Sequence, residues 1–245
     1  MRVIRGFVDA ELCLEREITL GAELANHLTR VLRLRSGDAV HLFNGDGREF
    51  SAVLTSLERK RTLARIESEI TPIAESSLDL TLAQGLCRGE KMDLVLQKAT
   101  ELGIAALQPL ITERTEVRLD AERESRRMLH WRSVLASACE QSGRATLPSL
   151  AAPIAFANWM AQNSQLADPP LALLLDPEGD VSLRDLPRSN QIVLAVGPEG
   201  GFSEAERTLM LRLGFVGMRF GPRIMRTETA GLAALAALQS HWGDC

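Results

Sequence analysis

The sequence contains no tyrosine, and aromatic residues make up only 4% of its 245 residues. Long apolar runs are also missing, because LALLL and AGLAALAAL fall far short of the roughly 18 residues that a membrane span needs. The charged amino-terminal segment MRVIRGFVDAELCLERE lacks the apolar stretch of a signal peptide. We therefore expect a cytoplasmic protein that does not contact a membrane.

Cysteine and histidine are scarce, at four residues each. No two cysteines form a CxxC pair, and no histidines form an HExxH pattern. Such spacings of cysteine and histidine are the sequence patterns that indicate metal sites and disulfide frameworks. We therefore expect reduced thiols at Cys13, Cys87, Cys139 and Cys245, and no metal site.

An excess of positive charge is missing too. Lys and Arg total 28 against 32 Asp and Glu, so the formal net charge is −4. A surface that is basic throughout is thereby excluded, and any contact with nucleic acid must use local patches. The 45% hydrophobic content is ordinary for a folded protein and excludes a disordered chain.

Residues 1–72 have the pattern of a small β-rich domain. Alternating apolar runs surround Asn44-Gly45-Asp46-Gly47, a combination that favours a tight turn and predicts a hairpin. A stripe of apolar residues predicts a short helix over 23–31. The segment 71–77 is typical of a linker, so a barrel-like domain over 1–72 is expected.

From residue 78 onward, predicted strands and helices alternate. The expected strands are 78–86, 105–110, 171–176, 191–196 and 217–220, and the expected helices are 91–102, 120–140, 203–213 and 227–239. Continuous apolar strands are typical of a parallel sheet buried on both faces. The pattern therefore predicts an α/β domain over 73–245.

Three glycine- or proline-rich turns follow strands of this domain: LLLDPEGD, AVGPEGGFSEAE and FGPRIMRTETAG. Ligands of open α/β sheets bind beyond the carboxyl ends of the strands, so the three turns predict one pocket. Gly197, Gly200 and Gly201 would let the backbone approach a ligand closely. Ser203 and Glu206 form a capping box pattern, which leaves Glu199 without a structural explanation. No GxGxxG or GxxxxGK[ST] motif is present.

Several of these segments resemble one known family. The blocks GPEGGFSEAE, GPRIMRTETA, ACEQSGR (138–144) and KMDLVLQKATELG (91–103) are similar to those of the RsmE family. RGF, HLTRVLRLRSGD and FNGDG extend the resemblance to the amino-terminal region. Members of that family are 16S ribosomal RNA (uracil(1498)-N(3))-methyltransferases of the SPOUT superfamily.

The resemblance implies a mixed α/β protein with a PUA-like, RNA-binding β-barrel and a SPOUT methyltransferase domain that contains a deep trefoil knot. It also implies a homodimer, S-adenosylmethionine as cofactor, and 16S RNA within the small ribosomal subunit as substrate. Another SPOUT enzyme that modifies a ribose or a different base is an alternative. A non-catalytic ribosome-assembly factor is a second alternative.

The resemblance also implies roles for single residues in the three turns. Arg226 is the first catalytic candidate, because its guanidinium could bind the uracil oxygens or a phosphate. Glu199 could serve as the base that removes the N(3) proton or could bind the cofactor. Glu228 fits the electrostatics of a helix start. The residues expected around the cofactor are Leu175, Asp176, Val196, Gly197, Glu199, Gly200, Gly201, Phe220, Gly221, Ile224, Met225 and Arg226.

Arginines near the amino terminus offer a phosphate-binding face. The expected RNA-binding residues are Arg2, Arg5, Arg30, Arg33, Arg35 and Arg144. Arg144 could instead bind the last carbonyls of its helix, or line the active site or dimer interface together with Glu140 and Gln141. Lys91 is expected on a solvated helix face, with RNA contact as the alternative.

Overall fold

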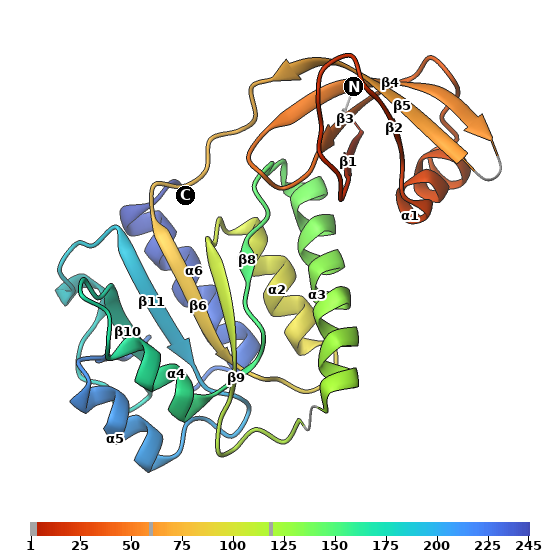
Figure 1. Cartoon of the computed structure of the whole chain (residues 1–245). Helices are drawn as coiled ribbons and strands as arrows, with labels where there is room; N and C mark the ends of the chain where they lie inside the picture. Colours follow the sequence, from red (N-terminus) through yellow and green to blue (C-terminus); the bar gives the residue numbers. More distant parts are fainter. Residues whose placement is uncertain (1–3, 59–60, 118–119) are drawn as a thin grey trace. The chain divides into compact units, whose positions relative to one another are not determined.

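The computed structural model describes residues 4–58, 61–117 and 120–245 (Figure 1). Arg2 therefore lies outside the described residues. The chain divides into two compact units. The first comprises Met1–Glu75 and Ala136–Leu147, and the second comprises Ser76–Leu135 and Pro148–Cys245. The segment Ala136–Leu147, which the sequence pattern assigns to the second domain, thus packs with the first unit.

The first unit is built on a five-stranded sheet with the order β1-β3-β4-β5-β2. Its strands are β1 (Arg5–Phe7), β2 (Glu17–Thr19), β3 (Ala39–Phe43), β4 (Glu49–Glu58) and β5 (Arg61–Ile70). The helix predicted over 23–31 is present as α1 (Ala22–Asn26), which continues as a π-helical turn over His27–Val31. Leu42, Phe50 and Ile66 are fully buried in the core of this unit.

The predicted hairpin is confirmed between β3 and β4, which pair antiparallel. Gly45 and Gly47 have φ angles of 88° and 93°, a conformation that side chains other than glycine rarely adopt. Asn44 Oδ1 accepts a hydrogen bond from the backbone of Asp46, and Asp46 accepts one from Arg48. Glycine and short polar side chains therefore fix the turn, as the Asn-Gly-Asp-Gly pattern predicts.

Arg5 ties the segment Ala136–Leu147 to this sheet. Its guanidinium donates to both carboxylate oxygens of Glu49 at 2.8 Å. The same group donates to the carbonyl oxygens of Cys139 and Arg144, at 2.6 and 3.1 Å. Since these contacts occupy Nε and both terminal nitrogens, and the side chain is 11% exposed, Arg5 has a structural role, which disfavours the RNA contact expected of it.

We predict that Glu49→Gln lowers the free energy of unfolding of this unit by about 3 kcal/mol, because the Arg5 charge stays buried without its partner. Burial raises the pKa of Glu49, but the hydrogen bonds and charges of Arg5 and His41 outweigh it and leave the pKa below its ordinary value of 4.5. A lowered folded-state pKa stabilises the protein above the unfolded-state pKa, and this contribution disappears as pH falls through the folded-state pKa.

Urea unfolding of wild type and variant, at neutral pH and at successively lower pH, measures both effects. The difference between the two proteins should be constant near neutrality and shrink in acid. Glu67→Gln is the control, because Glu67 pairs with Arg65 on the exposed surface. Equal effects of the two substitutions would contradict the structural role of the buried pair.

The second unit contains a sheet with the order β12-β10-β11-β6-β7-β8, and β9 also pairs with β7. All of these pairings are parallel. The strands are β6 (Asp79–Gly85), β7 (Ala106–Ile111), β8 (Ser149–Leu150), β9 (Ile154–Ala155), β10 (Leu171–Leu175), β11 (Gln191–Val196) and β12 (Val216–Met218). The helices are α2 (Lys91–Glu101), α4 (Phe156–Asn163), α5 (Glu204–Arg212), α6 (Thr227–Trp242) and the first part of α3 (Ala121–Ser142), whose residues from Ala136 onward belong to the first unit.

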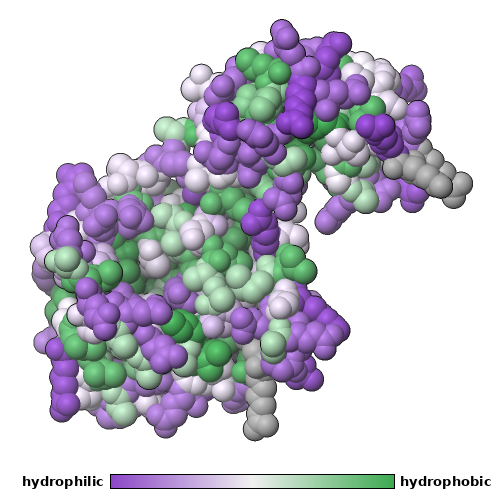
Figure 2. All heavy atoms as spheres, viewed as in Figure 1, coloured by the Kyte–Doolittle hydropathy of each residue, from purple (hydrophilic) through white to green (hydrophobic). Residues whose placement is uncertain are grey.

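Helices cover both faces of this sheet (Figure 1). Trp159 of α4 and Met210 of α5 pack with Val193 on one face. Gly231 of α6 lies against Leu82 and Val196 on the other face. In the view of Figure 2, apolar residues show between polar ones across the middle of this unit. Because helices pack on both faces of the parallel sheet, the α/β domain that the apolar strands predict is confirmed.

Two details differ from the sequence-based prediction. The last strand ends at Met218 rather than at 220, because the chain turns through Gly221, whose φ angle is 77°. Helix α4 was not predicted at all, and no side chain caps its start. None of the described helices is long and apolar enough to cross a membrane.

Candidate functional site

A cavity of about 820 Å³ lies at the carboxyl ends of β10, β11 and β12, which are neighbours in the sheet. The turns 174–178, 196–202 and 218–228 form most of its wall, and the remaining lining residues are Lys91, Arg114, Glu204, Arg207 and Ala230. Drug-sized ligands occupy cavities of roughly 300–1,000 Å³. The three turns singled out in the sequence therefore meet at one ligand-sized pocket.

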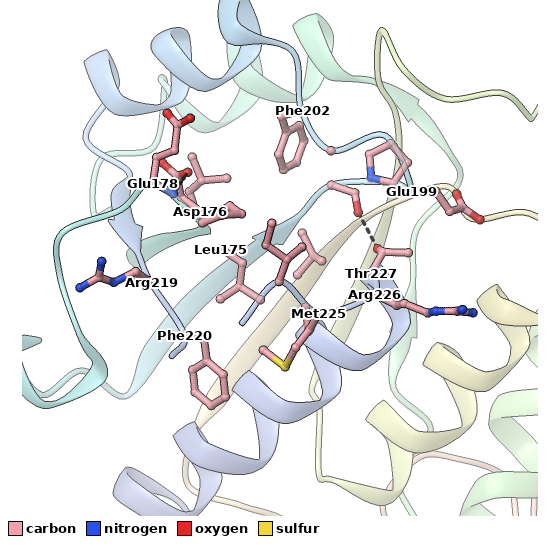
Figure 3. Close-up of a pocket in the computed structure, with 18 of the residues that line it drawn as sticks. Leu175, Asp176, Glu178, Glu199, Phe202, Arg219, Phe220, Met225, Arg226 and Thr227 are labelled. Carbon is pink, nitrogen blue, oxygen red and sulfur yellow. Dashed lines mark hydrogen bonds between the residues drawn. The ribbon is translucent and has the colours of Figure 1, made fainter. Parts of the chain in front are cut away.

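All twelve residues expected around a cofactor line this cavity. Leu175, Phe220 and Met225 come from two of the turns and lie near one another in Figure 3. Such apolar side chains can flank a flat ring, while backbone groups of the turns supply polar contacts. The cavity thus has room and suitable walls for a ligand that combines a flat ring with polar groups.

Close backbone packing shapes the turn after β11. A Cβ atom on Gly197 would lie 2.8 Å from the backbone nitrogen of Phe202. A Cβ atom on Gly85, at the end of β6, would lie 2.4 Å from the backbone nitrogen of Pro198. On Gly200 it would meet only side-chain atoms of Arg114, the nearest being Cβ at 3.1 Å. A side chain therefore cannot be added at Gly197 or Gly85 without moving backbone.

A buried hydrogen-bond network joins two of the turns. Thr227 donates its hydroxyl to the carbonyl oxygen of Gly197 at 2.5 Å, which Figure 3 marks as a dashed line. Gln84 of β6, itself fully buried, donates its amide to the Thr227 hydroxyl at 2.9 Å and to the Gly85 carbonyl at 3.0 Å. The start of α6 is therefore fixed to the loop after β11. Neither Gln84 nor Thr227 was singled out from the sequence.

We predict that Thr227→Val lowers the free energy of unfolding by about 1–3 kcal/mol, because the substitution leaves buried groups without a hydrogen-bond partner at nearly unchanged volume. Thermal or urea unfolding measures this loss. Thr229→Val is the matched control, since Thr229 lies on the exposed face of the same helix. If both variants unfold like the wild type, the network does not stabilise the pocket.

Asp176 is a fixed part of the pocket wall. Its carboxylate is buried and accepts a hydrogen bond from Arg207 Nε at 2.7 Å and another from the backbone of Glu178 at 3.0 Å. Its own backbone nitrogen donates to the carbonyl of Met218 at 3.0 Å. Because Arg207 belongs to α5, this ion pair links the turn after β10 to the helix after β11.

Glu199 is held by two donors. Its Oε1 atom accepts hydrogen bonds from Lys91 Nζ at 2.9 Å and from the backbone nitrogen of Arg88 at 3.0 Å. Partial burial raises the pKa of Glu199, but these two contacts outweigh it and lower the pKa below its ordinary value. A carboxylate with a lowered pKa is a weaker proton acceptor, which disfavours Glu199 as the base. Lys91, expected on a solvated face, lines the pocket instead.

Arg226 lies just before α6, and its side chain is exposed at the edge of the pocket. Within the part of the chain that the structure describes, no hydrogen bond or ion pair engages its guanidinium. In Figure 3 it extends on the side of the pocket where Glu199 also lies, away from Phe220. An unpaired cation at this position can serve a ligand, and it does not help to cap the helix.

The expected RNA-binding arginines separate into two groups. Arg30, Arg33 and Arg35 are exposed on the turn that follows α1, and Arg33 has a φ angle of 57°. Arg144 is buried and donates to Glu75 from Nε and Nη2, at 2.9 and 2.6 Å. Burial and the carboxylate partner of Arg144 therefore disfavour the RNA contact expected of this residue.

Glu140 and Gln141 do not line the pocket either. The Oε1 atom of Glu140 accepts a hydrogen bond from the backbone nitrogen of Phe7 at 2.8 Å, within the first unit. Burial raises the pKa of Glu140 above its ordinary value. The block ACEQSGR therefore holds the first unit together and does not contribute to the cavity.

The class of the protein follows from comparison with known families. A family model for an RNA methyltransferase domain matches residues 74–239, and a model for an RNA methyltransferase PUA domain matches residues 20–67. The first match covers the α/β unit with its pocket, and the second covers most of the five-stranded sheet. The fold and the site are thus those of an RNA methyltransferase with a PUA-like amino-terminal region.

Full-length relatives narrow this class. Ribosomal RNA small subunit methyltransferase E of Synechocystis is 34% identical, over 95% of this chain and 76% of that protein. The enzyme of the same name from Bacillus subtilis is 29% identical, over 90% of this chain and 88% of that protein. The chain belongs to the RsmE family of ribosomal RNA small subunit methyltransferases.

Two solved structures support the same assignment over the whole chain. The crystal structure of ribosomal RNA small subunit methyltransferase E from Neisseria gonorrhoeae bound to S-adenosyl methionine is 37% identical, covers 99% of both chains and has a TM-score of 0.90. A putative methyltransferase from Legionella pneumophila, in complex with the bound cofactor SAM, is 37% identical over both full chains, with a TM-score of 0.94.

Proposed function

We propose that this protein transfers a methyl group from S-adenosylmethionine to N(3) of a uracil in 16S ribosomal RNA, at uracil 1498. The observation that carries the proposal is the ligand-sized pocket at the carboxyl ends of β10, β11 and β12. Full-length relatives with this fold include proteins solved with the cofactor bound. Membership of the RsmE family supports the ribosomal RNA substrate.

The residues of the pocket fit this cofactor. Leu175, Phe220 and Met225 offer apolar walls for the adenine ring, and the backbone cradle around Gly197 has no space for a side chain. Where the backbone lies this close to the ligand, its carbonyl and amide groups can form hydrogen bonds to the edge of the adenine ring. When bound, S-adenosylmethionine supplies an electrophilic methyl group on a positively charged sulfur.

The remaining chemistry falls to the chain's own side chains. The N(3) proton of uracil must leave, and negative charge then develops over the ring oxygens. Arg226 is placed at the pocket edge, and none of the residues that the structure describes pairs with its guanidinium, so this group can bind those oxygens. Glu199, paired with Lys91, keeps the loop after β11 in place.

The wider assignments belong to the same proposal. The chain would consist of an RNA-binding domain over 1–72 and a catalytic domain over 73–245. In the first domain, the candidates for contacts to the RNA backbone are the exposed Arg30, Arg33 and Arg35. A homodimer, a closed PUA-like barrel and a trefoil knot around the pocket follow from the family resemblance. A substrate in the small ribosomal subunit accords with a cytoplasmic location.

Mass mapping of 16S RNA tests the proposal. RNA from cells that lack this gene should carry an unmethylated uracil at the target position, and purified protein with S-adenosylmethionine should restore the methyl group. Methylation at a ribose or at another base would favour a different enzyme of the same superfamily. Complete absence of methyl transfer, with cofactor bound, would favour an assembly factor.

A further inference from the structure

The turn at the end of α1 (Figure 1), here called the arginine turn and spanning residues 30–35, exposes apolar and positively charged side chains next to one another. Val31 is 67% exposed and Leu32 is 38% exposed. The other exposed residues of the turn are Arg30, Arg33 and Arg35. The sequence has no acidic residue from position 24 to position 37, so this short segment is positively charged in a protein whose formal net charge is −4.

Two leucines anchor the arginine turn to the core of the first unit. Leu28 is buried, and Leu34 packs against the same core cluster. The backbone nitrogen of Leu34 donates to the carbonyl oxygen of Leu28 at 2.9 Å, which closes the turn. Arg33, just before Leu34, has a left-handed φ angle of 57°. The turn is therefore held from its inner side, while Val31 and Leu32 stay in contact with water.

The backbone of Arg33 has a conformation that suits glycine better than arginine. Glycine is the usual residue in the left-handed position after a helix. Any other side chain there costs free energy, because its Cβ atom crowds a carbonyl oxygen. A cation near the end of a helix does interact favourably with the last carbonyl groups. That interaction accounts for one arginine, but it does not account for three arginines beside exposed apolar side chains.

The charged side chains of the arginine turn have no partner within the described part of the chain. No hydrogen bond or ion pair between described residues engages the guanidinium groups of its three arginines. Asp38 Oδ2 accepts a hydrogen bond at 2.6 Å from the backbone nitrogen of Arg35, not from its side chain. Single exposed apolar side chains are common on protein surfaces. Val31 and Leu32 differ because they are adjacent and lie among unpaired cations, so a partner that is both anionic and apolar matches this surface.

An unpaired nucleotide combines these two properties. Each nucleotide carries a negatively charged phosphate, and the flat face of its base is open to side chains once the base has left the stack. In a continuous double helix, neighbouring bases cover these faces and only the phosphates are accessible to the turn. A duplex would therefore bind the arginines and leave the apolar side chains in water. Apolar side chains such as leucine do pack against bases that have become unstacked.

We propose that the arginine turn binds an unpaired nucleotide of ribosomal RNA, with its base against Val31 and Leu32 and the adjacent phosphates on the three arginines. This inference rests on the proposed function, in which ribosomal RNA is the substrate, and it names the kind of RNA that the first unit takes. The phosphate contacts supply affinity and position the RNA, whereas the apolar contact requires an unstacked base. The turn thus favours a loop or bulge over a continuous helix.

Binding of the full-length protein to 16S RNA, measured without cofactor over a range of salt concentrations, tests this role. Val31→Ser should weaken binding about fivefold to tenfold at every salt concentration, because it removes an apolar contact and no charge. Arg33→Gly should lower the slope of log affinity against log salt concentration by about 0.7–0.9, since one phosphate contact is lost. Its melting temperature should not fall, because glycine fits the left-handed φ angle of this position.

Two labelled probes with the same number of phosphates test whether the bound base is unpaired. The probes are a single-stranded oligouridylate and an RNA duplex. Val31→Ser should weaken binding of the oligouridylate by about the same factor as that of 16S RNA, and it should leave binding of the duplex unchanged. Leu14→Ser is the matched control, because Leu14 is an apolar residue of the first unit that is 54% exposed and lies outside the arginine turn. It should bind every RNA like the wild type.

The outcomes separate this inference from the proposed function. If the wild-type protein does not produce N(3)-methyluracil in 16S RNA, the proposed function is wrong, while the binding measurements still decide the role of the arginine turn. The base contact is wrong if the wild type does not bind the oligouridylate, or if Val31→Ser binds both probes like the wild type or weakens both equally. An unchanged salt slope in Arg33→Gly would overturn the phosphate contact. A changed oligomeric state of Val31→Ser at unchanged RNA affinity would show that the turn contacts a second copy of this chain instead.

Discussion

Arg226→Ala should lower the single-turnover rate of methylation about 100-fold while cofactor affinity stays within a few fold of the wild type. Loss of one charged contact to a transition state costs about 3 kcal/mol, which is roughly two orders of magnitude in rate. The structure supports a large effect, because the guanidinium lies at the pocket edge and no described residue engages it. Its removal therefore leaves no buried group without a partner.

Arg226→Lys should rescue little of this rate, because an ammonium group cannot reproduce the planar, two-pronged donor of arginine. Arg212→Ala is the control, since Arg212 is exposed in the last turn of α5 and does not line the cavity. The measurement is methylation of 16S RNA at saturating cofactor, beside a melting curve of each variant. Normal turnover with a lowered melting temperature in Arg226→Ala would assign the residue a structural role.

The location of the pocket could be predicted from sequence because the necessary signals are local. A buried strand appears as a short apolar run, and a turn appears as glycine and proline directly after it. The runs before Asp176 and Gly197 have this form, and the structure places both turns at the same edge of the sheet. Parallel strands place their carboxyl ends together, so adjacency follows from the fold class.

The partners of the pocket residues could not be predicted in the same way. Lys91 and Glu199 are 108 positions apart in sequence, and Asp176 and Arg207 are 31 apart, so no periodicity links the members of either pair. Charged residues on a helix face also look alike whether they meet solvent or a distant loop. For this reason Lys91 was expected on a solvated surface.

The same limit applies to the partners of Arg5 in the first unit. Arg5 was expected to bind RNA because five arginines lie near one small domain and together offer a phosphate-binding face. Its acceptors, the carbonyl oxygens of Cys139 and Arg144, lie more than 130 positions away in sequence. The segment 136–147 contacts Arg5 through backbone carbonyl oxygens, and such contacts do not depend on the types of its side chains. Its assignment to the first unit could therefore not be predicted from the sequence.

Gly197→Ala should lower the affinity for S-adenosylmethionine between tenfold and a hundredfold. The added Cβ atom would lie 2.8 Å from the Phe202 nitrogen and 2.9 Å from the carbonyl carbon of Gly201, and neither is the end of a flexible side chain. Crowding of this kind costs about 1–3 kcal/mol, and each 1.4 kcal/mol is about a tenfold change in affinity. The strain falls on the loop after β11, which forms part of the cavity wall.

Gly200→Ala provides the matched comparison within the same loop. Its Cβ atom would lie 3.1 Å from the Cβ atom of Arg114, a contact that involves no backbone atom and is relieved by a much smaller shift than the one at Gly197. We therefore expect a loss of less than tenfold for this variant. Calorimetric titration with S-adenosylmethionine, beside thermal unfolding of each protein, compares the two. Wild-type affinity in a folded Gly197→Ala variant would show that the loop moves freely, and a larger loss for Gly200→Ala would show that the cofactor approaches the backbone at Gly200 instead.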